Sequence, residues 1–176
     1  MNISTFADKL EKIDLQLVAD KLMSSEYGYG WNIEKTQLAI KRYKKFLTLQ
    51  YLYPNFELVP SKEIDAVWHE HILVNTYQYI QDCHYLFGYL LHHRWTDSKK
   101  DIVESQKVRR AFITTKHLFM EIFAEDIFGE TNFEAAPCVD LPISSEASLQ
   151  IGACVNLPKY SFSDDASSYE NFQILS

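Results

Sequence analysis

Apolar residues recur at helical spacing from the N-terminal segment to about residue 130, and this pattern limits the fold more than any other feature of the chain. Side chains three and four residues apart lie on the same face of an α-helix, so the spacing predicts amphipathic helices with one buried face. The glycines of segment 27–32 and Pro54 interrupt the pattern, and Gly129 follows its last long run. We therefore predict an all-α fold, a bundle of about five helices with short connections in residues 1–130.

Polar residues in front of the apolar runs predict where the helices begin. Asn32 precedes the first long run, Ser61 follows a proline at the start of the next, and Asn75 has a glutamine three residues later, as in a capping box. The helix after Asn75 either ends near Gly88 or continues for another turn, because apolar spacing extends to residue 91. A further long helix is predicted from residue 101 to about residue 128.

Residues 131–176 differ from the rest of the chain in composition. They hold three of the five prolines, many serines, and six acidic residues against a single lysine. The pentapeptides CVDLP (138–142) and CVNLP (154–158) repeat at a spacing of 16, which either brings Cys138 and Cys154 to one site or reflects a duplicated turn. We predict an irregular or partly disordered acidic tail that can dock to a protein partner.

Charge and composition exclude several classes of protein. The net charge of −7, from 17 basic and 24 acidic residues, argues against a nucleic-acid-binding surface, which needs clustered basic side chains. No apolar run approaches the roughly 20 residues of a membrane-spanning helix. The N-terminal segment carries charges where a signal peptide would be apolar, and an odd count of three cysteines favours a reducing compartment. We expect a cytoplasmic protein. The alternative is export by a route that needs no signal peptide.

Residues 64–95 hold five of the six histidines and the only cysteine that precedes the tail. On an ideal helix of about 100° per residue, His71 lies in the middle of an apolar face that includes Trp68, while Asp65 and His69 share its edge. Ala66 and Glu70 are expected to point away from this face.

The next predicted helix carries a matching face. Tyr79 and Cys83 lie on it, Asp82 lies at its border, and His93 falls beside Asp82 if the helix continues past the glycine at position 88. His92 would point elsewhere. Packing of the two helices would bring His71, Asp82, Cys83 and His93 toward a shared interior.

Imidazole, thiolate and carboxylate groups in one place are typical of a zinc or iron site. Our leading hypothesis is a metal site with ligands drawn from His69, His71, Asp82, Cys83, His92 and His93, supported by Asp65, Trp68 and Tyr79. Two alternatives stay open. The polar cluster can be structural, in an adaptor protein that binds a partner through its acidic tail. It can also be catalytic, in a hydrolase-type enzyme with Cys83 as nucleophile or with His69 and Asp65 as a base pair.

The same residues resemble the glycine-rich domain-containing protein-like family of plant and bacterial proteins. The resemblance covers about residues 22–95 and rests on GYGW (28–31), YP (53–54), VP (59–60), Asp65-x-x-Trp68-His69-x-His71-x-Leu73, Tyr79-x-x-Asp82-Cys83, Phe87-Gly88 and His92-His93. Membership would imply a shared site built from these residues. It implies no particular activity, because none is established for the family.

Overall fold

The structure, a computed structural model, describes residues 3–94 and 102–127. Within these ranges the protein is helical and has no β-strand, so the all-α prediction is confirmed. The described helices are α1 (Ile3–Glu11), α2 (Gln16–Met23), α3 (Ile33–Leu52), α4 (Lys62–Val74), α5 (Thr76–Phe87) and α6 (Ile102–Phe123).

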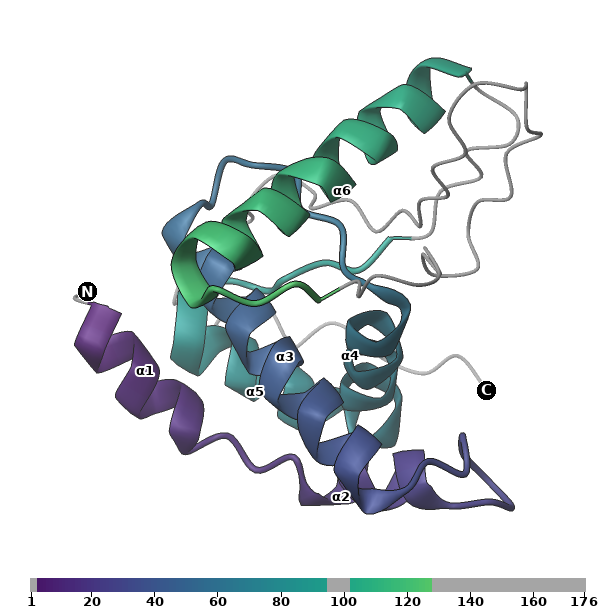
Figure 1. The fold of residues 1–176 in the computed structure, drawn as a ribbon. Coiled ribbons are helices and arrows are strands. Elements are labelled where there is room, and N and C mark those ends of the chain that lie inside the picture. Colours follow the sequence, from purple (N-terminus) through teal and green to yellow (C-terminus); the bar gives the residue numbers. More distant parts are fainter. Residues whose placement is uncertain (1–2, 95–101, 128–176) are drawn as a thin grey trace, which may run out of the picture.

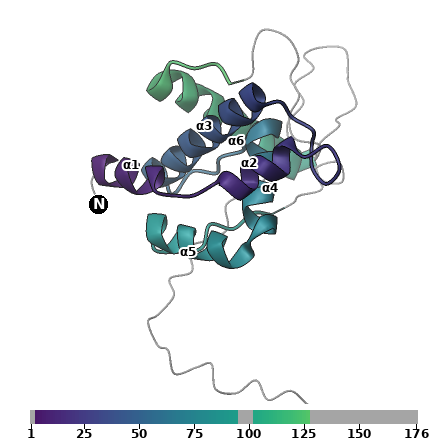
Figure 2. The same ribbon diagram turned by 90° about the horizontal axis from the view of Figure 1, so that it is seen from below.

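Helices α3 and α4 form the centre of the molecule. Helix α2 packs against both of them, and α1 contacts α3 and α5 (Figures 1 and 2). Helix α6 lies across one end, where its buried side chains join the same apolar core as those of the other helices. The largest fully buried side chains include Trp68, Tyr43, Phe46, Phe112 and Phe119. One continuous core therefore extends from α1 to α6.

The predicted caps begin their helices. The side chain of Asn32 accepts a hydrogen bond from the Lys35 backbone N–H at 2.9 Å, and Asn75 accepts one from Gln78 at 3.1 Å. Ser61 accepts a longer one, of 3.4 Å, from the third residue after it. These side chains satisfy N–H groups that lack a partner in the first turn of a helix.

Gly88 ends α5, so the helix does not continue past it. This residue has φ of +78°, a left-handed conformation that favours glycine and terminates a helix. The chain from residue 89 to residue 94 is consequently non-helical. The alternative in which His93 lies on the same helical face as Asp82 is therefore wrong.

Helix α4 is buried on more than one side. Ala66 and Glu70, which we expected to point away from the apolar face, are only 7% and 8% exposed. The reason is that α2, α3 and α5 all pack against α4, whereas the helical pattern alone indicates one buried face.

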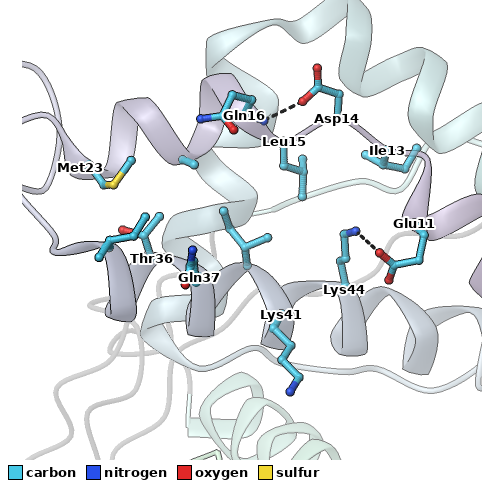
Figure 3. Close-up of a pocket in the computed structure, with 13 residues that line it drawn as sticks. Glu11, Ile13, Asp14, Leu15, Gln16, Met23, Thr36, Gln37, Lys41 and Lys44 are labelled. Atoms are coloured by element: carbon cyan, nitrogen blue, oxygen red, sulfur yellow. Dashed lines mark hydrogen bonds and ion pairs between the residues drawn. The ribbon is translucent and has the colours of Figure 1, made fainter.

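The connection between α1 and α2 lies over α3 and leaves a hollow of about 460 Å³ beneath it (Figure 3). Its rim is polar and paired: Lys44 contacts Glu11 at 3.0 Å, and Asp14 accepts a hydrogen bond from the Gln16 backbone at 2.9 Å. The titratable side chains that line this hollow are exposed or half-buried. The hollow therefore has no buried charged group that would select a ligand.

Helix α6 is shorter than predicted and is tied to the centre by polar contacts. Thr115 accepts a hydrogen bond from the Val59 backbone at 2.9 Å, and Glu125 pairs with Arg42 at 2.8 Å and with Lys45. Among the helices that the structure describes, none is both long and apolar enough to cross a membrane. The predicted tail, with Cys138 and Cys154, lies outside the described residues, and its role in partner binding stays a prediction.

Candidate metal site

Asp65, His69 and His93 form a compact group at the edge of α4. Each side chain offers one ligand atom, and these atoms all lie within 4.8 Å of one another. The Nε2 atom of His93 lies 2.8 Å from Asp65 Oδ1, and His69 Nδ1 lies 3.9 Å from the other carboxylate oxygen. The two imidazole rings are in contact, with centroids 4.4 Å apart. Two imidazoles and a carboxylate at this spacing can hold a metal ion.

The group differs in exposure from one side to the other. The side chains of Asp65 and His93 are 4% and 8% exposed, whereas that of His69 is 43% exposed. The carboxylate and one imidazole are therefore fixed in the protein interior, and the second imidazole faces solvent. An ion bound here would be held from one side and open to water on the other.

Local sequence accounts for two of the three groups. Asp65 and His69 are four residues apart on α4, so the helix alone places them side by side. His93 arrives from the non-helical segment that follows Gly88, and its ring packs edge-on against Trp68 with centroids 4.5 Å apart. The third group is therefore placed by tertiary packing.

A chain of buried hydrogen bonds holds the segment that carries His93. The indole Nε1–H of Trp68 donates to the Tyr79 hydroxyl at 2.9 Å, and that hydroxyl donates in turn to the Leu91 carbonyl. Burial raises the pKa of Tyr79 far above its ordinary value of 10.0, so the phenol keeps its proton and remains a donor. Tyr79 thus fixes the backbone two residues before His93.

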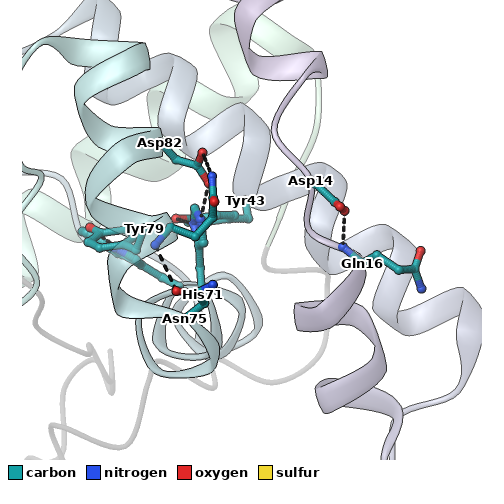
Figure 4. Close-up of polar contacts among 9 residues, drawn as sticks. Asp14, Gln16, Tyr43, His71, Asn75, Tyr79 and Asp82 are labelled. Atoms are coloured by element: carbon teal, nitrogen blue, oxygen red, sulfur yellow. Dashed lines mark hydrogen bonds and ion pairs between the residues drawn. The ribbon is translucent and has the colours of Figure 1, made fainter.

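His71 and Asp82 form a separate, buried cluster, which Figure 4 shows together with Tyr43. His71 Nε2 lies 3.0 Å from Asp82 Oδ2, and its Nδ1 lies 3.0 Å from the Tyr43 hydroxyl. Gln78 donates to the second oxygen of Asp82 at 2.8 Å. An ionised carboxylate can only accept, so Nε2 carries a proton and donates to Asp82, while Nδ1 shares a hydrogen bond with the Tyr43 hydroxyl. Both nitrogens of His71 are occupied by the protein.

The predicted ligands therefore separate into two places. His69 and His93 meet at Asp65, which we expected only to support the site, while His71 and Asp82 pair with each other. His92 is half-buried next to His93 in sequence. The predicted convergence of His93 with Asp82 and Cys83 does not occur, because α5 ends at the glycine before it can carry His93 to that face.

Cys83 is buried and poorly suited to act as a nucleophile. Burial raises the pKa of its thiol to about 11, despite hydrogen bonds with the Leu91 backbone and Tyr79 that act in the opposite direction. The thiol is consequently protonated at neutral pH, whereas a catalytic cysteine reacts as the thiolate.

Two partners of these clusters were not identified from the sequence. Tyr43 belongs to α3 and contacts His71 from 28 residues away, and the Leu91 carbonyl contributes through its backbone alone. Tyr43 carried no signal beyond its place on an apolar face. Comparisons of the chain with protein-family models, with curated protein sequences and with solved structures found no match.

Proposed function

We propose that this protein binds a single divalent metal ion, zinc or iron(II), through Asp65, His69 and His93. The observation that carries the proposal is the convergence of three ligand atoms within 4.8 Å of one another. Imidazole nitrogen and carboxylate oxygen are ligands common to both metals.

The hydrogen bond between Asp65 and His93 supports the proposal. The proton that joins them occupies the position between a carboxylate oxygen and an imidazole nitrogen, 2.8 Å apart. A cation that replaces this proton would gain both groups as ligands after a small separation of the side chains. Metal binding would then release a proton and weaken as the pH falls.

The number of ligands indicates the class of metal centre. Structural zinc sites use four protein ligands, whereas three protein ligands leave a coordination position for water or substrate. Two histidines and one carboxylate with open positions are also the ligand set of many non-haem iron(II) proteins. We therefore propose a metal centre with at least one coordination position open to water or substrate, and with His69 on its solvent side.

We also propose that the chain is a member of the glycine-rich domain-containing protein-like family. The motifs of that resemblance include Asp65, His69 and His93, so a metal site would explain why these residue types occur together. The family resemblance and the metal site are separate proposals, and the metal site does not depend on membership.

Metal analysis of protein purified without a histidine tag tests the site. We expect about one zinc or iron ion per chain in the wild type, and a loss of most of that metal in His69→Ala and in His93→Ala. His117→Ala is the matched control, because His117 is exposed on α6 and is not one of the three grouped side chains. A wild-type protein that neither retains nor takes up either metal, with its helical content intact, would rule the proposal out.

A further inference from the structure

A second hollow of about 240 Å³ lies on the other side of α4, between the start of α2 and the junction of α4 with α5. Figure 4 shows Asp14 on the α1–α2 segment, across from His71 and Asp82. The residues that line it are Lys12, Asp14, Leu17, Val18, His71, Val74, Asn75, Gln78 and Asp82. This volume is sufficient for a ligand of a few non-hydrogen atoms.

The inner wall of the hollow carries a buried carboxylate. Asp82 is 5% exposed, and among the described residues it accepts hydrogen bonds from His71 and Gln78 alone. A carboxylate has room for about four hydrogen bonds, so Asp82 retains capacity to accept from a ligand. A buried carboxylate with unused acceptor capacity is stabilised by a cationic donor beside it.

The other lining residues add a negative charge and an apolar surface. Asp14 contributes a second carboxylate, while Lys12 contributes a single ammonium group from an exposed position, so carboxylates outnumber ammonium groups at this hollow. Leu17, Val18 and Val74 provide aliphatic walls. A ligand that suits all of these groups has a cationic end and a short hydrocarbon body.

We propose that this hollow is a binding site for small aliphatic ammonium compounds, with the ammonium group against Asp82 and the hydrocarbon chain against Leu17, Val18 and Val74. The ammonium group donates to the Asp82 carboxylate and to the side-chain oxygens of Asn75 and Gln78, while both nitrogens of His71 stay engaged. A neutral alcohol of the same length lacks the countercharge, and a carboxylate of the same length is repelled.

This site is independent of the proposed metal site. His69 and His71 are two residues apart on α4, so their side chains diverge by about 160° around the helix axis. Substitutions at Asp82 or Leu17 therefore leave Asp65, His69 and His93 unchanged, and failure of one proposal has no bearing on the other.

Titration of isotopically labelled protein with n-butylammonium chloride, 1-butanol and sodium butyrate, at constant ionic strength, tests the proposal by nuclear magnetic resonance. We expect saturable shifts of the Val18, Val74 and Gln78 amides with n-butylammonium, at a dissociation constant on the order of millimolar for so small a ligand. The alcohol and the carboxylate should bind at least about tenfold more weakly. Equal responses to all three compounds, or shifts that do not saturate, would overturn the proposal.

Two variants locate the binding. Asp82→Asn removes the charge at nearly constant size and should weaken n-butylammonium binding at least about tenfold, whereas Asp20→Asn, an exposed position on α2, should leave it unchanged. Leu17→Trp blocks the site without changing the core, because Leu17 is 63% exposed. The larger ring would fill the hollow that Leu17 lines. Full binding by Leu17→Trp would refute the assignment, even where Asp82→Asn fails to fold.

Discussion

Replacement of Tyr79 by phenylalanine tests how the site is held together. The change removes one oxygen atom that accepts from the Trp68 indole at 2.9 Å and donates to the Leu91 carbonyl. Trp68 and Leu91 are 1% and 0% exposed, so neither group gains water in exchange. An unsatisfied buried polar group costs about 1–3 kcal/mol, and two such groups give a loss of about 2–6 kcal/mol. This is a large share of the roughly 5–15 kcal/mol that stabilises a typical domain.

Urea unfolding followed by circular dichroism measures this loss. Tyr77→Phe is the matched control, because Tyr77 is on the same helix and 72% exposed, so its free energy of unfolding should change by less than about 0.5 kcal/mol. If Tyr79→Phe is as stable as this control, the buried hydrogen-bond chain does not stabilise the protein and the reasoning fails.

The same variant separates stability from positioning. Leu91 lies two residues before His93, so a looser segment should lower metal affinity by about 10–100-fold, as loss of a group that orients a ligand commonly does. Metal titration under conditions in which both proteins are folded measures the difference. Wild-type protein that binds metal, together with Tyr79→Phe that binds it equally well, would show that Tyr79 does not position His93. Wild-type protein that binds no metal would instead refute the site itself.

Further substitutions and pH changes test other parts of the structure. Iodoacetamide should label Cys83 slowly at neutral pH and rapidly only after unfolding, because burial raises the pKa of its thiol to about 11. Peptide mass spectrometry measures the labelling, and rapid labelling of the folded protein would contradict this expectation. Gly88→Ala should cost roughly 1 kcal/mol in calorimetry, because its new Cβ meets no atom within 4 Å and only the strain of the positive φ counts against it. Gly28→Ala should cost more, because its Cβ would lie 1.7 Å from a backbone oxygen. The reverse order of the two losses would refute the packing around Gly28. Burial acts to raise the pKa of Glu125, but hydrogen bonds and charges from Lys45 and Arg42 outweigh it and lower the pKa below 4.5. The stability that this pairing contributes is present above pH 4.5 and is lost as the pH falls through the lowered pKa. The stability advantage of wild type over Glu125→Gln should therefore shrink in acid, and an advantage that is constant with pH in urea unfolding would contradict the pairing.

The sequence alone determined the features that depend on near neighbours. Helical spacing predicted the helices, and caps at Asn32, Ser61 and Asn75 marked their starts, because each cap binds a backbone group three residues away. The pairing of Asp65 with His69 was predictable for the same reason, since four residues complete about one helical turn.

Tertiary structure decided which histidines meet. The glycine at position 88 was compatible with a helix end or with continuation, and its left-handed conformation turns the chain so that His93 reaches Asp65, 28 residues away in sequence. The partner of His71 on α3 and the burial of Glu70 likewise depend on how whole helices pack. Hydrophobic periodicity indicates which face of a helix is buried, but it carries no information on which other helix covers that face. The candidate metal site therefore follows from the sequence in two of its residues and from the fold in the third.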